Sequence, residues 1–191
     1  MSTVEEILAF WFGRPSELRY GKPQDFWFTK KPKFDQELRN HFLGDYQQAA
    51  ARALDHWRAS PHSCLALILL LDQFPRNMFR GTALAFATNP QALAAADAAV
   101  AKGFDQELMT VERWFVYLPF EHSENLAHQH QSVELFATLS HDPDSAATID
   151  YAIRHRLVIE RFGRFPHRNK ILGRATTPEE AEFLKQPRSS F

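Results

Sequence analysis

Apolar side chains recur every three or four residues along most of the chain, between residues that begin or end helices. Phe34, Leu38, Phe42 and Tyr46 follow one another every four residues, which places them on one face of a helix. The alternation of apolar and polar residues that is typical of a half-buried strand is missing. The sequence therefore predicts an all-α protein of about seven to nine helices.

Capping residues locate the ends of these helices. Ser2 and Thr3 stand three positions before Glu5 and Glu6, the spacing of a capping box, and Gly13 should end the first helix. Because proline lacks the N–H that a helix interior needs, we expect helices further along the chain to end at prolines.

Further along the chain, Pro75 should end the helix that begins at Pro61, and Pro119 should end another. Ser123 is the expected N-cap of the following helix, with Glu124 in its first turn. Thr177 with Glu180 should open a last short helix.

Two segments of the chain resemble each other. Residues 72–82 and 163–176 each contain Phe-Pro, then Arg-Asn, and later Gly, Arg and Thr in slightly different order, just after an expected helix. Related helix–turn–helix halves would give this pattern, although a chance likeness between two copies is the alternative. No linker rich in Gly, Ser or Pro divides the chain, so we expect residues 1–191 to form one domain of stacked antiparallel helical hairpins, similar to tetratricopeptide repeats.

Aromatic residues are frequent, with 17 Phe, 4 Trp and 4 Tyr, and most of them should form the core. Part of this aromatic surface is left for a groove or a subunit contact, so a homo-oligomer is compatible with the sequence. The longest apolar run, Cys64–Leu71, is far shorter than the roughly 20 residues of a membrane span. A single cysteine and an acidic start predict a cytoplasmic protein that does not enter the membrane.

Charge is distributed unevenly along the chain, although the net charge is only −1. Residues 1–153 carry −6, residues 154–174 carry +6 and residues 175–191 carry −1. The arginines of the basic segment could pair with Asp72, Glu121 and Glu124, or they could bind a small anion. Nucleic acid is disfavoured, because the total charge is not basic and the aromatics beside these arginines look like core residues.

A second polar group of residues surrounds Pro119. Glu121 and His122 are candidates for an acid–base pair if both face a pocket. Glu124 and His128 lie four residues apart, but no His-Glu-x-x-His, Glu-x-x-His or paired-cysteine spacing accompanies them. We therefore expect neither a metal nor another cofactor.

Three longer motifs resemble the bacterial domain-of-unknown-function 924 family: LDQFPRN at 71–77, YLPFEHSE at 117–124 and RFGRFPHRN at 161–169. The opening residues 7–13 are similar as well, and the likeness extends over essentially the whole chain. The resemblance implies a bacterial, all-helical, tetratricopeptide-like protein and carries no reaction with it. Asn125 departs from the family pattern, which has an acidic residue there.

These motifs coincide with the polar groups found from the residues alone, and each lies at a helix end beside a proline. We expect such turns to meet in one polar pocket, in which Arg76 and Arg168 hold an anion while Glu121 and His122 carry protons. The candidate ligand-binding residues are Asp72, Arg76, Asn77, Glu121, His122, Glu124, Arg164, His167, Arg168 and Asn169.

Three functions fit this pocket. The first is a helical-repeat protein that binds a small anionic ligand or a peptide. The second is a metal-independent hydrolase or transferase that uses Glu121 and His122. The third is a purely structural network of arginines and carboxylates in a protein that interacts with other proteins through another surface.

Overall fold

The computed structural model describes residues 1–190. Within this range, nine α-helices and five 3-10 helices follow one another and no strand is found, so the expected all-α fold is confirmed. The α-helices are α1 (Val4–Phe12), α2 (Pro32–Ala50), α3 (Pro61–Leu71), α4 (Gln73–Met78), α5 (Asn89–Ala101), α6 (Thr110–Glu121), α7 (Leu126–Ala137), α8 (Ala146–Phe162) and α9 (Pro178–Phe183). The 3-10 helices are η1 (Asp55–Ala59), η2 (Ala83–Phe86), η3 (Phe104–Glu107), η4 (Pro143–Ser145) and η5 (Pro166–Arg168).

Several helix ends lie where the capping residues predict them. Thr3 and Glu6 form a capping box before α1, and Thr177 and Glu180 form another before α9. Gly163 ends α8 in the left-handed conformation, with φ of 66°, which a residue without Cβ adopts readily.

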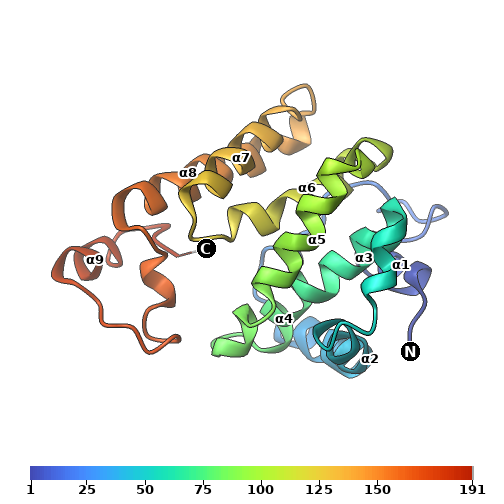
Figure 1. Cartoon of the computed structure of the whole chain (residues 1–191), viewed down its shortest axis with the longest axis horizontal. Coiled ribbons are helices and arrows are strands. Elements are labelled where there is room, and N and C mark those ends of the chain that lie inside the picture. The colour runs from blue at the N-terminus through green and yellow to red at the C-terminus, as the bar shows by residue number, and fades with distance from the viewer. Residues whose placement is uncertain (191) are drawn as a thin grey trace.

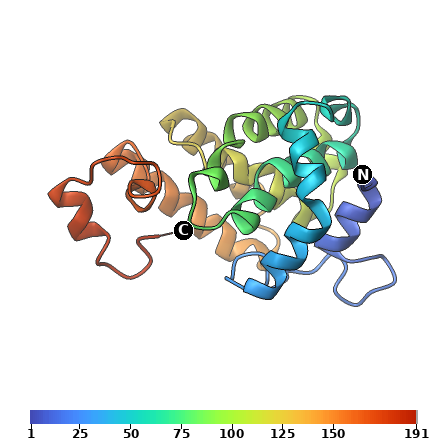
Figure 2. The ribbon, with the colours of Figure 1, turned by 90° about the horizontal axis from the view of Figure 1, so that it is seen from below.

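Helix α3 forms the centre of the main core. All eight residues of Cys64–Leu71 are buried, and α1, α2, α5 and α6 pack around them (Figures 1 and 2). Trp11 and Phe115 contact each other edge to face within this core, with ring centroids 5.5 Å apart. The aromatic residues thus bury their surface against a helix that is apolar on every side.

Helices α7 and α8 continue from α6 and lie side by side, and α9 stands at the far end of the molecule (Figure 1). A second, smaller apolar cluster fills this end, where Val158, Ile159 and Phe165 are buried and Phe162 and Phe183 pack on them. None of the helices within residues 1–190 has the length and apolar character that crossing a membrane requires.

Two prolines lie inside helices, so the helix ends predicted at Pro75 and Pro119 are wrong. Helix α3 ends at Leu71, and Pro75 is the third residue of α4, where an N–H would have no partner in the helix. Pro119 is buried within α6, which continues to Glu121. Packing of the buried residues around Pro119 outweighs the hydrogen bond that it removes, and Glu121 is consequently helical.

The prediction that Ser123 caps α7 is also wrong, because the N-cap is Asn125. The Asn125 carboxamide accepts a hydrogen bond from the Ala127 amide at 2.8 Å. Ser123 Oγ and His128 Nδ1 lie 2.9 Å apart, and Glu124 stands before the helix, from where it reaches Arg174.

Candidate functional site

A polar cluster forms where the α3–α4 junction, the end of α6, α8 and η5 meet. We call it the arginine–histidine cluster, and its members are Asp72, Arg76, Glu121, His122, His155 and Arg168. Four of these residues, Asp72, Glu121, His155 and Arg168, are buried, while Arg76 and His122 are partly exposed at its edge.

Asp72 lies at the centre of the cluster, where the chain breaks between α3 and α4. Its carboxylate accepts hydrogen bonds from His122 Nδ1 at 2.8 Å and from Gln73 at 2.7 Å, and Arg76 Nη1 lies 2.9 Å from Oδ1. Burial alone would raise the pKa of Asp72, but Arg76 and His122 hold it down at about 2. Asp72 is therefore ionised although it is fully enclosed.

His122 caps the end of α6 with its ring turned to Asp72. Burial lowers the pKa of His122 to about 4, and the charge of Arg76 adds to the decrease. A neutral imidazole that donates from Nδ1 to an ionised carboxylate carries its lone pair on Nε2. No hydrogen bond within residues 1–190 uses that Nε2.

Glu121 does not pair with His122, although the two are neighbours in the sequence. Its Oε1 lies 3.1 Å from His155 Nδ1, which also lies 2.9 Å from the Tyr151 carbonyl. Burial raises the pKa of Glu121 to about 8, and the charge of Asp72 adds to the rise. Glu121 is accordingly a neutral carboxylic acid at pH 7, and its buried Oε2 has no hydrogen bond within residues 1–190.

The arginine that stands directly before the asparagine in each repeated Phe-Pro segment contacts the same aromatic ring. The guanidinium carbons of Arg76 and Arg168 lie 5.8 Å and 4.8 Å from the centroid of the Phe86 ring. Arg168 also lies 4.2 Å from the Phe165 ring centroid and donates from Nη1 to the His122 carbonyl at 2.9 Å. Burial lowers the pKa of Arg168 to about 9, and the nearby Arg76 lowers it further.

Both arginines keep a buried nitrogen that forms no hydrogen bond within residues 1–190. These nitrogens are Nη2 of Arg76 and Nε of Arg168. At pH 7 the cluster contains two guanidinium ions and one ionised carboxylate, because Glu121 and His122 are neutral. One positive charge of the cluster is left without a matching negative charge.

Glu124 lies next to the cluster and is occupied by its own partners. Its carboxylate accepts two hydrogen bonds from the Arg174 guanidinium, at 2.7 Å and 3.0 Å, and one from the Phe165 amide at 2.8 Å. Burial would raise the pKa of Glu124, but the hydrogen bond from Arg174 lowers it. His167 is half-buried in η5 beside Arg168, and burial lowers its pKa to about 3.

Three of the predicted site residues lie outside the cluster. Arg164 and Asn169 both donate to Glu180, the buried first-turn residue of α9. Asn77 donates to Asp35 of α2 at 2.8 Å. The structure thus brings together Asp72, Arg76, Glu121, His122 and Arg168, with Glu124 and His167 beside them.

Sequence reasoning did not select two residues that the structure places in or against the cluster, His155 and Phe86. His155 shares the buried face of α8 with Ala152 and Ile159, so its helical spacing was the available signal. Phe86 sits in the short η2 helix, and its position carries no periodic signal.

Fold and site together define an all-helical protein in which an aspartate–histidine pair, a neutral glutamic acid and two arginines share one buried cluster. A family model described as "Bacterial protein of unknown function (DUF924)" matches residues 7–188, and the chain belongs to this family. A solved structure, of the protein of unknown function ATU0120 from Agrobacterium tumefaciens, is similar to it. The two sequences are 43% identical, 95% of this chain and 96% of that chain are covered, and the TM-score is 0.85. A search among curated proteins gave no match.

Proposed function

We propose that the protein binds a small carboxylate at the arginine–histidine cluster, either a free acid or the C-terminus of a peptide. The observation that carries this proposal is the pair of buried arginine nitrogens without acceptors, Arg76 Nη2 and Arg168 Nε. A buried donor without a partner costs about 1–3 kcal/mol, and an anion between the two arginines would satisfy both donors.

Charge supports the same ligand class. A monoanion would match the single positive charge of the cluster that no carboxylate balances. The neutral Glu121 does not compete with it and offers a hydroxyl that can donate to a carboxylate oxygen. Planar guanidinium groups bind carboxylates with defined geometry.

The second candidate function is catalysis, and the contact between Asp72 and His122 favours it. A carboxylate 2.8 Å from Nδ1 fixes the imidazole so that Nε2 can accept a proton, as a general base in a hydrolase or transferase does. In this proposal Asp72 replaces Glu121 as the partner of His122, and Glu121 remains as a proton donor.

The structural alternative also has support, because every arginine of the repeated segments has at least one carboxylate or carbonyl partner. Thermal unfolding with added ligands distinguishes a carboxylate-binding cluster from a purely structural network. Acetate and the dipeptide Ala-Ala are added to the full chain during thermal unfolding, with chloride as the ionic-strength control.

We expect acetate, Ala-Ala or both to raise the free energy of unfolding by about 2.7 kcal/mol at one hundred times the dissociation constant. The Arg168→Gln variant should lose this increase. The Arg161→Gln variant, which removes an exposed arginine paired with Glu179, should keep it. Acetate alone would indicate a free acid and Ala-Ala alone a peptide end. If neither compound increases the free energy of unfolding, or if Arg168→Gln shows the same increase, the cluster is a structural network and does not bind a carboxylate.

We infer the remaining properties from features of the chain. Cys64 is buried and burial raises the pKa of its thiol, which supports a structural cysteine in a reducing, cytoplasmic compartment. The pairing of α6 with α7 and of α7 with α8 supports tetratricopeptide-like hairpins in a single domain over residues 1–191.

A further inference from the structure

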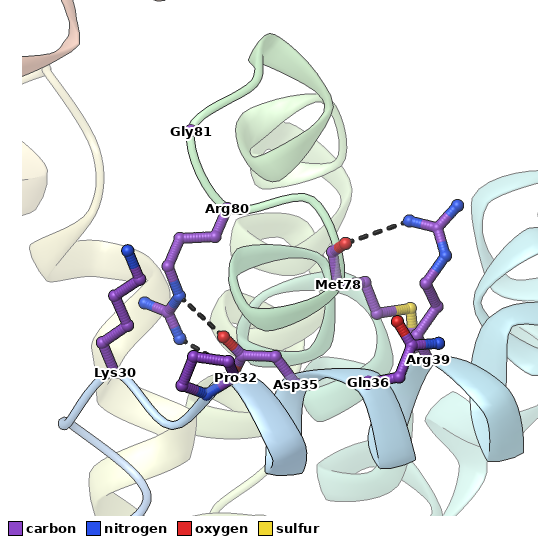
Figure 3. A pocket seen from close by; sticks show the side chains of 8 residues that line it. All are labelled: Lys30, Pro32, Asp35, Gln36, Arg39, Met78, Arg80 and Gly81. Carbon is purple, nitrogen blue, oxygen red and sulfur yellow. Dashed lines mark hydrogen bonds and ion pairs between the residues drawn. The ribbon is translucent and has the colours of Figure 1, made fainter.

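A hollow lies away from the cluster, between the start of α2 and the loop that follows α4 (Figure 3). Its volume is about 400 Å³, and Lys30, Arg39 and Arg80 line it together with the single acid Asp35. Figure 3 shows Lys30 and Arg80 on one side of the hollow and Arg39 on the other.

Asp35 is already fully engaged by its neighbours. Its carboxylate accepts two hydrogen bonds from Arg80, at 2.9 Å and 3.0 Å, and one from Asn77 at 2.8 Å. The charge of Asp35 is therefore matched by Arg80. This bidentate contact also fixes the Arg80 guanidinium at the rim of the hollow.

The other two cations, Lys30 and Arg39, differ from Arg80 in their contacts. Arg39 donates to the Met78 carbonyl at 3.1 Å, and its guanidinium lies 5.1 Å from the Phe79 ring centroid. Within residues 1–190, neither Lys30 nor Arg39 forms an ion pair with a carboxylate. The hollow consequently contains two positive charges that no side chain balances, and one of them is held in place by two contacts.

We propose that this hollow binds a phosphate monoester. Such a group carries close to two negative charges at neutral pH, which matches Lys30 and Arg39. Pro32 and Met78 add an apolar wall for the organic part of the ester. Lys31 and Lys33 are exposed beside the hollow and strengthen the positive field that attracts the ligand.

Calorimetric titration of the full chain with O-phosphoserine and with inorganic phosphate tests the proposal. We expect saturable binding of O-phosphoserine, weakened at least tenfold in the Lys30→Ala/Arg39→Gln variant. The matched control is Lys22→Ala/Lys170→Ala, which removes two exposed lysines outside the hollow and should bind like the unmodified chain. Phenyl phosphate, titrated in the same way, should bind more tightly than inorganic phosphate, because its ring can contact Pro32 and Met78.

Lys30→Glu gives a second test that does not depend on a helix or on the core, because Lys30 is exposed and lies outside α2. It should abolish binding while the circular dichroism spectrum stays unchanged. Arg168→Gln should still bind O-phosphoserine, which separates this hollow from the arginine–histidine cluster. Absent binding, equal weakening in the lysine control, or unchanged binding in Lys30→Glu would overturn the proposal.

Discussion

The two segments that resemble each other, residues 72–82 and 163–176, place their phenylalanine and their asparagine in similar surroundings. In each, the phenylalanine before proline is fully buried: Phe74 in the main core and Phe165 in the smaller one. Each asparagine donates to a carboxylate of another helix, and an arginine shares that carboxylate. These sets are Asn77 and Arg80 on Asp35, and Asn169 and Arg164 on Glu180.

One position separates the two segments. Arg76 has Asp72 two residues before the phenylalanine, whereas the second segment has Gly163 at that place. Within residues 1–190, the hydrogen bond that Arg168 donates goes to the His122 carbonyl rather than to a carboxylate. The shared motif thus positions Arg76 and Arg168 at Phe86, while the difference between Asp and Gly leaves the charge of Arg168 unbalanced.

Removing the buried phenylalanine of each segment should have the strongest effect on stability, and it tests whether the two cores belong to one domain. Phe74→Ala and Phe165→Ala should each lower the free energy of unfolding by about 3–5 kcal/mol, because a buried aromatic ring is removed. The four tryptophans lie in the main core, so their fluorescence reports its unfolding, and circular dichroism reports all helices. If the chain is one domain, both signals shift together in both variants. If only the circular dichroism midpoint moves in Phe165→Ala, the smaller core unfolds separately and the chain forms two domains.

The next effect separates the two arginines. Arg76→Gln leaves the ionised, buried Asp72 without its guanidinium and should cost about 3–5 kcal/mol. Arg168→Gln removes a hydrogen bond to a carbonyl and should cost only about 1–2 kcal/mol. Urea unfolding of both variants at pH 7 measures the difference. Equal losses would mean that the aspartate does not distinguish the segments.

The smallest effect is a pH dependence in which two carboxyl groups act in opposite directions. The pKa of Glu121 is raised to about 8, so the folded chain keeps a proton that the unfolded chain has released above about pH 4.5. The buried histidines His122, His155 and His167 act the other way up to about pH 6.5, because burial lowers their pKa and only the unfolded chain protonates them there. Stability should therefore fall, by up to roughly 1.4 kcal/mol per pH unit, only between about pH 7 and 8. The pKa of Asp72 is lowered to about 2, so its contribution is present above about pH 4 and is lost on acidification.

Urea unfolding at several pH values measures this slope, and Glu121→Gln should flatten it between about pH 7 and 8. The control is Glu134→Gln, which changes an exposed carboxyl group of α7 and should keep the slope of the unmodified chain. A slope that persists in Glu121→Gln would assign the titration to another group.

Helical periodicity and capping signals predicted the fold, because both depend on residues close together in the sequence. The exceptions lie at Pro75, Pro119 and Ser123. Packing around the buried Pro119 involves distant residues, whereas Pro75 fits the first turn of a new helix and Asn125 is a competing cap two residues after Ser123. The cluster could be predicted in part, since its charged residues lie in recognisable motifs. The partner of His122 could not, because Asp72 comes from a turn 50 residues away.

The contact of Phe86 with the arginine–histidine cluster also depends on long-range packing. So does the position of three predicted residues outside the cluster: Asn77, Arg164 and Asn169. The sequence near Asn77, Arg164 and Asn169 does not indicate which helix supplies the carboxylate that each of them contacts. Asp35 and Glu180 are ordinary first-turn acidic residues of α2 and α9, and only the fold places them against the asparagines.

The distances along the chain between contacting residues also set the order in which the cluster can assemble. Arg164 and Asn169 reach Glu180 across 16 and 11 residues, so these contacts close short loops. Arg168 meets His122 across 46 residues and Arg174 meets Glu124 across 50, and closing longer loops slows such contacts. During synthesis from the N-terminus, Asp72, Arg76 and His122 emerge well before Arg168. The nascent chain therefore holds a charge-balanced aspartate–arginine pair first, and the excess positive charge arrives only with the last docking step.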